Sequence, residues 1–212
     1  MTAQLFNIFD TLCGWCFVAH NETRKLVDDL PDDIAVQHLH RKLFVGPHEM
    51  DINDGMIAMV RRVGQEIAPQ KTGARISDAH IDFLCRPGTR YNSELTARAF
   101  AGAQSLAPHE AYKFGVALQK AVFETGLDFN DPKAISDLFE KVTKGDRAAF
   151  LEVLQAPETA RKAEVTATLA RKLMTQVGSN GVPCLILSVD DHLVQIDPYD
   201  AKAARAEILS RL

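Results

Sequence analysis

Cys13-Gly14-Trp15-Cys16 stands at the junction of two segments with different patterns. The apolar run at residues 5–9 predicts a β-strand, and residues 17–27 predict a helix. Two thiols separated by two residues at such a turn can make and break one disulfide bond. A helix start carries partial positive charge and unpaired N–H groups, so a thiolate at Cys13 is stabilised there. The motif therefore predicts a redox pair, with Cys16 one turn away from a nucleophilic Cys13.

Two other interpretations of the motif are zinc binding and a structural disulfide. Zinc sites of this kind have a second close pair of ligands, whereas Cys85 and Cys184 each stand alone. His38 and His40 could complete a site from one side of a strand, but the spacing fits no common zinc module. A disulfide across two residues restrains little of the unfolded chain. We therefore expect no metal and no other cofactor, and a non-catalytic zinc or partner-binding protein stays as an alternative.

The composition limits the class of protein. With 212 residues, of which 46% are hydrophobic, the chain can bury a full core without disulfide staples. The net charge of −4 is spread along the chain, which excludes a basic stripe for nucleic acid or a polybasic patch for a membrane. No apolar stretch approaches the ~20 residues of a membrane span. The N-terminus lacks the pattern of a signal peptide, so we expect a cytoplasmic protein, with a mature periplasmic form left open. The oligomeric state is not indicated.

The two ends of the chain predict β-structure. Residues 34–40 form a second expected strand, which makes a βαβ unit with parallel strands and a right-handed crossover. Residues 184–189 and 192–196 predict an antiparallel hairpin around a polar turn. A terminal helix is expected to begin at Asp197-Pro198.

The interior of the chain predicts helices. Met56 and Met59 belong to one apolar stripe, and Val165 and Leu169 to another, and both stripes are expected to pack in the core. Apolar residues recur at helical spacing in residues 52–67, 93–105, 111–122, 131–142, 146–154 and 165–177.

This order of elements predicts an α/β protein with a thioredoxin-like fold, in which a βαβ…ββα mixed sheet carries a large all-α insertion. Residues 1–45 and 175–212 would form the thioredoxin-like domain. Residues 46–174 would form the helical insertion domain.

The Gly-rich loop that ends in Val182-Pro183 would meet the cysteines in such a fold. With these residues, the CxxC motif and the insertion, the chain resembles the DsbA-like thiol–disulfide oxidoreductases over its whole length in outline. The resemblance implies that the Val182–Pro183 peptide bond is cis. It also implies that Val182 and Pro183 bind an extended substrate through exposed backbone groups.

Gly14-Trp15 departs from the Pro-His pair of the periplasmic members of that family. No histidine adds charge beside Cys13, so the disulfide is expected to be less oxidising than in those enzymes. In this respect the chain resembles the cytoplasmic branch described as predicted disulfide isomerases. The expected substrates are protein or glutathione disulfides and thiols.

The resemblance and the motif together suggest roles for the site residues. Cys13 would attack a disulfide, and Cys16 would resolve the mixed disulfide that results. Trp15 would lie at the mouth of the site as an apolar platform for substrate, unless it packs onto the insertion instead. Asp10 is interpreted as a turn residue that binds local N–H groups, with proton transfer to Cys16 as the alternative.

Other polar or reactive residues receive structural interpretations. Cys184 is expected to be a buried strand cysteine, and Cys85 is given no role. His38 and His40 are interpreted as partly exposed strand residues.

A second class of enzyme shares this architecture. Kappa-type glutathione transferases and hydroxychromene-carboxylate isomerases resemble the chain in outline but carry serine at the position of Cys13. The presence of both Cys13 and Cys16 disfavours this alternative.

Overall fold

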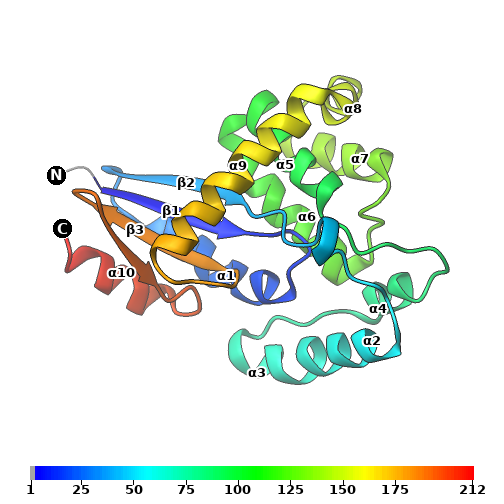
Figure 1. Ribbon diagram of the computed structural model, residues 1–212, viewed down its shortest axis with the longest axis horizontal. Helices are drawn as coiled ribbons and strands as arrows, with labels where there is room; N and C mark the ends of the chain where they lie inside the picture. Colours follow the sequence, from blue (N-terminus) through cyan, green and yellow to red (C-terminus); the bar gives the residue numbers. More distant parts are fainter. Residues whose placement is uncertain (1–2) are drawn as a thin grey trace.

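A mixed four-stranded sheet organises the chain in a computed structural model that describes residues 3–212. Residues 1 and 2, which belong to the first predicted domain segment, lie outside the described residues. The strands lie in the order β2-β1-β3-β4, and β1 runs parallel to β2 and antiparallel to β3 (Figure 1). Their bounds are β1 Ala3–Phe9, β2 Ile34–His40, β3 Cys184–Val189 and β4 His192–Ile196. The sheet confirms the predicted βαβ unit, the terminal hairpin and the thioredoxin-like fold.

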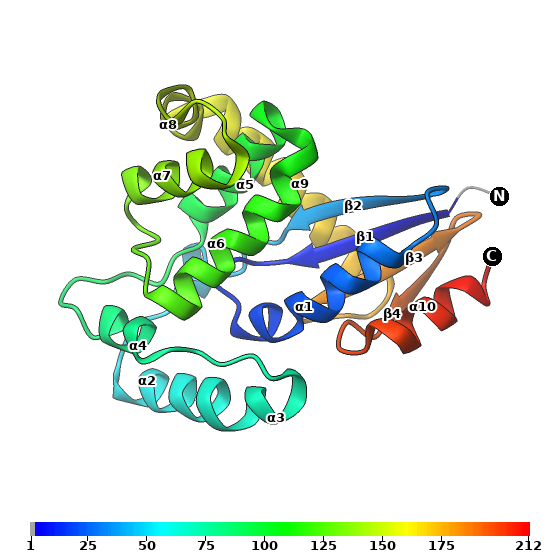
Figure 2. The same cartoon turned by 180° about the vertical axis from the view of Figure 1, so that it is seen from behind.

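Helices cover both faces of the sheet (Figures 1 and 2). Helices α1 (Gly14–Asp29) and α10 (Ala201–Leu209) lie on one face, and α9 (Pro157–Gln176) crosses the other. Leu5 packs in the cluster with α1 and α10, whereas its neighbour Phe6 packs in the cluster that includes α9. Because successive strand residues point to opposite faces and both faces are covered, β1 is an apolar run rather than an alternating one.

The stretch between β2 and β3 is largely helical, as predicted. Its α-helices are α2 Asp54–Arg61, α3 Ala68–Thr72, α4 Asp78–Leu84, α5 Glu94–Leu106, α6 Ala111–Thr125, α7 Pro132–Thr143 and α8 Arg147–Gln155, followed by α9. Short 3₁₀ turns lie at Gly46–His48 and Pro108–Glu110, and a π-helical turn at Arg62–Ile67 joins α2 to α3. Asp131 and Asp146 cap α7 and α8 through their side chains, and Gly126 ends α6 in the left-handed conformation. Helix α4 was not predicted.

Four details of the sequence prediction are wrong. Val165 is 66% exposed, whereas three of the six buried residues of α9 are alanines, one of which packs against two alanines of α5. Met59 is 51% exposed, whereas Met56 is buried as expected. His40 is fully buried rather than partly exposed. Helix α10 begins after Asp200, since Asp197 instead makes a local turn by accepting a hydrogen bond from the Tyr199 N–H.

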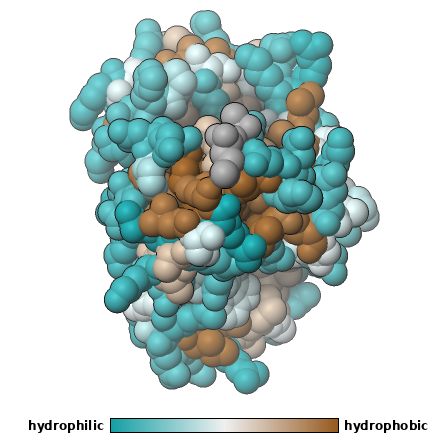
Figure 3. All heavy atoms as spheres, turned by 90° about the vertical axis from the view of Figure 1, so that its left-hand side faces the viewer, coloured by the Kyte–Doolittle hydropathy of each residue, from teal (hydrophilic) through white to brown (hydrophobic). Residues whose placement is uncertain are grey.

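The surface at the starting ends of β1 and β2 is shown in Figure 3. Apolar side chains gather on this side of the molecule, which is also the side where both termini lie (Figures 1 and 3). The CxxC turn lies at the other end of β1 (Figure 1). Among the helices of residues 3–212, none combines the length and apolar character that crossing a membrane would require.

Candidate active site

Cys13 occupies the residue that precedes the first turn of α1. Its N–H donates to the Asp10 carbonyl at 3.1 Å, and its carbonyl accepts from the Phe17 N–H at 3.0 Å. Within residues 3–212, no side chain caps this helix start, and its first turn carries no acidic residue. The first N–H groups of α1 therefore have no side-chain acceptor among the described residues. These groups and the positive end of the helix dipole can interact with a sulfur at this position.

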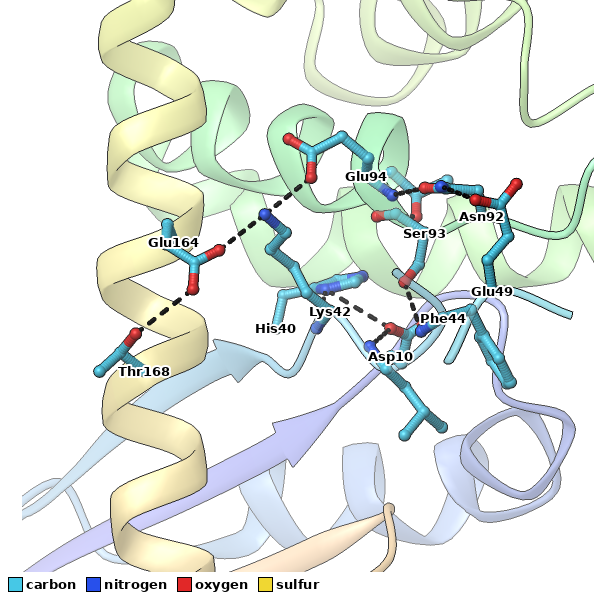
Figure 4. Close-up of polar contacts among 12 residues, drawn as sticks. Asp10, His40, Lys42, Phe44, Glu49, Asn92, Ser93, Glu94, Glu164 and Thr168 are labelled. Carbon is cyan, nitrogen blue, oxygen red and sulfur yellow. Dashed lines mark hydrogen bonds and ion pairs between the residues drawn. The ribbon is translucent and has the colours of Figure 1, made fainter. Parts of the chain in front are cut away.

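Asp10 holds the turn that carries the motif. Its two carboxylate oxygens accept hydrogen bonds from the N–H groups of Leu12 at 2.8 Å and Leu43 at 2.7 Å. His40 lies beside it, with Nδ1 3.8 Å from Asp10 Oδ2 (Figure 4). The Nε2 of His40 accepts from the Thr11 N–H at 3.2 Å. These contacts confirm the turn role of Asp10 and explain why His40 is buried, since its ring nitrogens are satisfied there.

The insertion contacts the same region at two points, at Tyr91 and at Lys42. The Tyr91 hydroxyl donates to the carbonyl of Leu12, one residue before the motif. Lys42 lies between Glu94 of α5 and Glu164 of α9, with Nζ–Oε2 distances of 2.7 and 2.8 Å (Figure 4). Both contacts fix the insertion against the segments that carry the cysteines. Sequence analysis missed Tyr91, because its partner is a backbone group 79 residues away.

The two cysteines differ in their surroundings although both are largely buried. Cys13 is 6% exposed and Cys16 is 3% exposed, and both are free thiols. Burial raises the pKa of the Cys16 thiol well above its ordinary value, and a hydrogen bond with Cys13 raises it further. Cys16 therefore carries its proton at neutral pH in this state.

The loop before β3 meets the motif. The Val182–Pro183 peptide bond is cis, and the Cys13 thiol donates to the Val182 carbonyl with an S–O distance of 3.4 Å. Cys184 is buried on β3, as expected, and burial raises the pKa of its thiol. The structure thus brings Cys13, Val182 and Pro183 together from the two ends of the chain.

Trp15 lies at the rim of the site. Its ring packs edge-on against Tyr199, with 6.4 Å between centroids, and Lys71 Nζ lies 4.0 Å from the centre of the same tyrosine ring. Trp15 therefore contacts the loop that precedes α10, and part of its indole stays exposed.

A mostly apolar groove of about 310 Å³ opens beside Cys13. Its far wall comes from the segment between β2 and α4, where Gly64 approaches Ile76 so closely that a Cβ on Gly64 would lie 2.5 Å from it. This approach needs glycine. The apolar lining outside the motif consists mainly of Leu43, Phe44, Met50, Met56, Met59, Val60, Val63, Ile76, Phe123 and Val182. Such a groove fits an extended chain with apolar side chains.

Cys16 faces the other way, toward a small cavity of about 10 Å³. The cavity is lined by residues of β1, α1 and α6 together with Pro183, and several of them are polar: Asn7, His20, Thr23, Tyr112 and Gln119. Sequence analysis missed His20, although its spacing of four residues from Cys16 places both on one face of a helix.

The two histidines of β2 do not form a metal site with Cys13 and Cys16, because each contacts other residues. His38 stacks on Tyr112 with 3.7 Å between ring centroids, and His40 contacts Asp10 and Thr11. Among residues 3–212, no group of three or more His, Cys, Asp or Glu side chains has the proximity needed to hold a metal ion.

Comparisons with known proteins give a family from one search and a fold from another. The family model described as the DSBA-like thioredoxin domain matches residues 4–204. The cytosolic disulfide reductase DsbM from Pseudomonas aeruginosa is similar in structure, with a TM-score of 0.81, 19% identity and 98% of each chain covered. Its structure with GSH gives a TM-score of 0.80 at 18% identity, again covering 98% of each chain.

A more distant likeness extends to the oxidoreductase DsbA from Xylella fastidiosa. The TM-score is 0.58 at 14% identity, and the match covers 99% of this chain and 86% of that one. A search of curated proteins finds no match.

Proposed function

This chain belongs to the DSBA-like thioredoxin domain family, and we propose that it is a thiol–disulfide oxidoreductase that works through Cys13 and Cys16. The main support is the position of Cys13 at the start of α1, where its sulfur lies 3.4 Å from the Val182 carbonyl oxygen and contacts Cys16. A sulfur in this position can attack a substrate disulfide, and a second thiol in contact can take over its bond.

The exchange proceeds in two displacements. The Cys13 thiolate attacks one sulfur of a substrate disulfide, which forms a mixed disulfide and releases the other sulfur as a thiolate that takes up a proton. The Cys16 thiolate then attacks Cys13, which forms the Cys13–Cys16 disulfide and releases the second substrate thiolate. The substrate gains two electrons and two protons, and the two protein thiols lose them. In the opposite direction the same steps oxidise a dithiol.

The groove beside Cys13 supports protein segments with apolar side chains as substrates. In our proposal Trp15 and the groove hold such a segment, while the backbone of Val182 and Pro183 pairs with it. Glutathione is proposed as a second substrate. Its support is the likeness in fold to a disulfide reductase whose structure was determined with GSH.

Reduction of insulin disulfides by dithiothreitol tests the activity. We expect the native protein to accelerate the reaction and Cys13→Ser to abolish the acceleration, because no attacking sulfur remains. Cys85→Ser is the matched control, since Cys85 is an exposed thiol that lines neither the groove nor the inner cavity. Full activity of Cys13→Ser would refute the assignment.

We further propose that the protein acts as a reductase in the cytosol. Gly14-Trp15 between the cysteines and the likeness in fold to a cytosolic disulfide reductase support this direction. Equilibration of the Cys13–Cys16 pair with glutathione buffers tests it. We expect a potential near that of thioredoxin, roughly −270 mV, whereas a value near roughly −120 mV would indicate an oxidant. Disulfide isomerase activity is tested separately by reactivation of a protein with scrambled disulfides.

A further inference from the structure

His20 lies on the same face of α1 as Cys16, one turn further along the helix. It is 4% exposed, and both residues line the small cavity between α1, β1 and α6. The cavity volume of about 10 Å³ is at the lower limit for a single water molecule. The two side chains are not hydrogen-bonded to each other in this structure, so the route for a proton between them is one water molecule in this cavity.

The hydrogen bonding of His20 leaves a base on its far nitrogen. Nδ1 lies within hydrogen-bonding distance of the Phe17 carbonyl, which can only accept, so Nδ1 carries the proton. The ring also stacks on Phe17, with 5.2 Å between centroids. The lone pair is therefore on Nε2, which is buried and has no hydrogen-bond partner within residues 3–212. Buried polar atoms without partners are rare in folded proteins.

The surroundings of His20 keep it neutral. Burial lowers the pKa of its imidazole below the ordinary value. The charged groups around it are Arg24 on α1 and Lys120 and Glu124 on α6. The Tyr112 hydroxyl on α6 stays protonated, because burial raises its pKa. A neutral imidazole is the form that can accept a proton.

The second displacement needs such a group. Cys16 must lose its proton to attack, yet burial raises the pKa of its thiol. Asp10 is another candidate acceptor near the motif, but each of its carboxylate oxygens accepts a backbone N–H group, from Leu12 or Leu43, and a proton on either oxygen would weaken the turn that these bonds hold. His20 has an unpartnered Nε2 among the described residues, and it lines the same cavity as Cys16.

We propose that His20 accepts the Cys16 proton when Cys16 attacks the mixed disulfide at Cys13, an inference that rests on the thiol exchange proposed above. The proton moves from Cys16 Sγ through one water in the cavity to His20 Nε2, the Cys16–Cys13 bond forms, and the bond from Cys13 to the substrate sulfur breaks. The departing thiolate takes up one proton from solvent, and the imidazolium gives one proton to solvent, which returns His20 to its neutral form.

Rapid mixing of the reduced protein with glutathione disulfide separates the two displacements. Acid quenching followed by intact mass measurement gives the amounts of reduced protein, glutathione adduct and internal disulfide at each time. The Cys85→Ser background removes the exposed thiol. We expect His20→Gln to leave adduct formation unchanged and to slow decay of the adduct by roughly 10²-fold at pH 7, the usual range for loss of a general base.

His80→Gln is the matched control. His80 is also buried, its Nδ1 lies 3.0 Å from the Val122 carbonyl, and its Nε2 is likewise unpartnered among the described residues. It does not line the cavity of Cys16, so adduct decay in His80→Gln should match the native rate. Equal decay in His20→Gln and the native protein would overturn the inference, as would equal slowing in both variants.

The pH profile of adduct decay in the native protein gives a second test that needs no substitution at His20. We expect a plateau near neutral pH that falls only at acidic pH, where His20 takes up a proton. A rate that rises roughly tenfold per pH unit from pH 5 to 8 would show that hydroxide removes the proton and would overturn the inference. Absence of any adduct would refute the proposed function instead.

Discussion

The outer and inner sides of the Cys13–Cys16 turn differ in almost every respect. On the outer side, Cys13 lines an apolar groove of about 310 Å³ that contains three methionines. On the inner side, Cys16 faces a cavity of about 10 Å³ with polar residues around it. A large substrate has room to reach the first sulfur and not the second. This difference matches our two proposals, that the outer side binds substrate and that the inner side accepts the Cys16 proton.

The two sides are also built by different parts of the chain. The segment between β2 and α4 supplies most of the outer wall, including Met50, Met56 and Met59. Methionine side chains are flexible and polarizable, so they adapt to varied apolar partners. The inner wall comes from β1, α1 and α6, which pack in the core. Substrate preference can therefore vary on one side without disturbing the other.

The largest effect is expected from removal of the inner thiol. Cys16→Ser should lose turnover with insulin, because the mixed disulfide at Cys13 cannot be resolved, and covalent complexes should accumulate. Cys184→Ser removes another buried thiol and should keep turnover. Non-reducing electrophoresis and the turnover assay check both variants. Turnover by Cys16→Ser at the native rate would contradict the assignment of Cys16 as the thiol that resolves the mixed disulfide.

Asp10→Asn should destabilise the turn that separates the two sides. An amide group has one acceptor oxygen, so the N–H of either Leu12 or Leu43 loses its partner. We expect a loss of roughly 1–3 kcal/mol in the free energy of unfolding, measured by urea denaturation. An unchanged midpoint would show that these two bonds do not hold the turn.

Acid should loosen the inner side through His38, which contacts Asn7 and stacks on Tyr112. Burial lowers the pKa of His38 to about 4, so the unfolded chain binds more protons below its ordinary pKa. Stability is then present above that ordinary value and is lost as the pH falls toward 4. Between pH 7 and 5 this amounts to about 2 kcal/mol.

Urea denaturation of His38→Gln over the same pH range checks this origin. Between pH 7 and 5, the free energy of unfolding of the variant should fall by about 2 kcal/mol less than that of the native protein. The same pH dependence in both proteins would assign the acid sensitivity to other groups.

The smallest effect is expected on the outer side. Met59→Gln replaces an exposed apolar side chain of the groove and should raise KM for an apolar peptide disulfide by about threefold with kcat unchanged. Val165→Gln alters an exposed apolar residue of α9 outside the groove and should leave KM unchanged. Equal KM values for Met59→Gln and the native protein would argue against binding in the groove.

The predictable features were those fixed by local sequence. The strands at residues 34–40, 184–189 and 192–196 match β2, β3 and β4 at both ends, since each is an apolar run bounded by turn residues. The CxxC turn was placed correctly between β1 and α1 for the same reason. The predicted strand at residues 5–9 begins two residues inside β1.

The features that could not be predicted from the sequence depend on contacts between segments that are far apart in the chain. The groove requires Gly64 to meet Ile76, and the turn requires Asp10 to reach the N–H of Leu43. Neither contact leaves a periodic signal. Val165 was misplaced because bulky residues dominate a hydropathy pattern, while the close contact between α9 and α5 selects alanine.

Covalent labelling by glutathione disulfide tests the difference between the two sulfurs most directly. Cys13→Ser and Cys16→Ser, each in the Cys85→Ser background, would be incubated with it under identical conditions and measured by intact mass. We predict one glutathione on Cys16→Ser and none on Cys13→Ser. An adduct on Cys13→Ser, or none on Cys16→Ser, would contradict the assignment of Cys13 as the sulfur that meets the substrate.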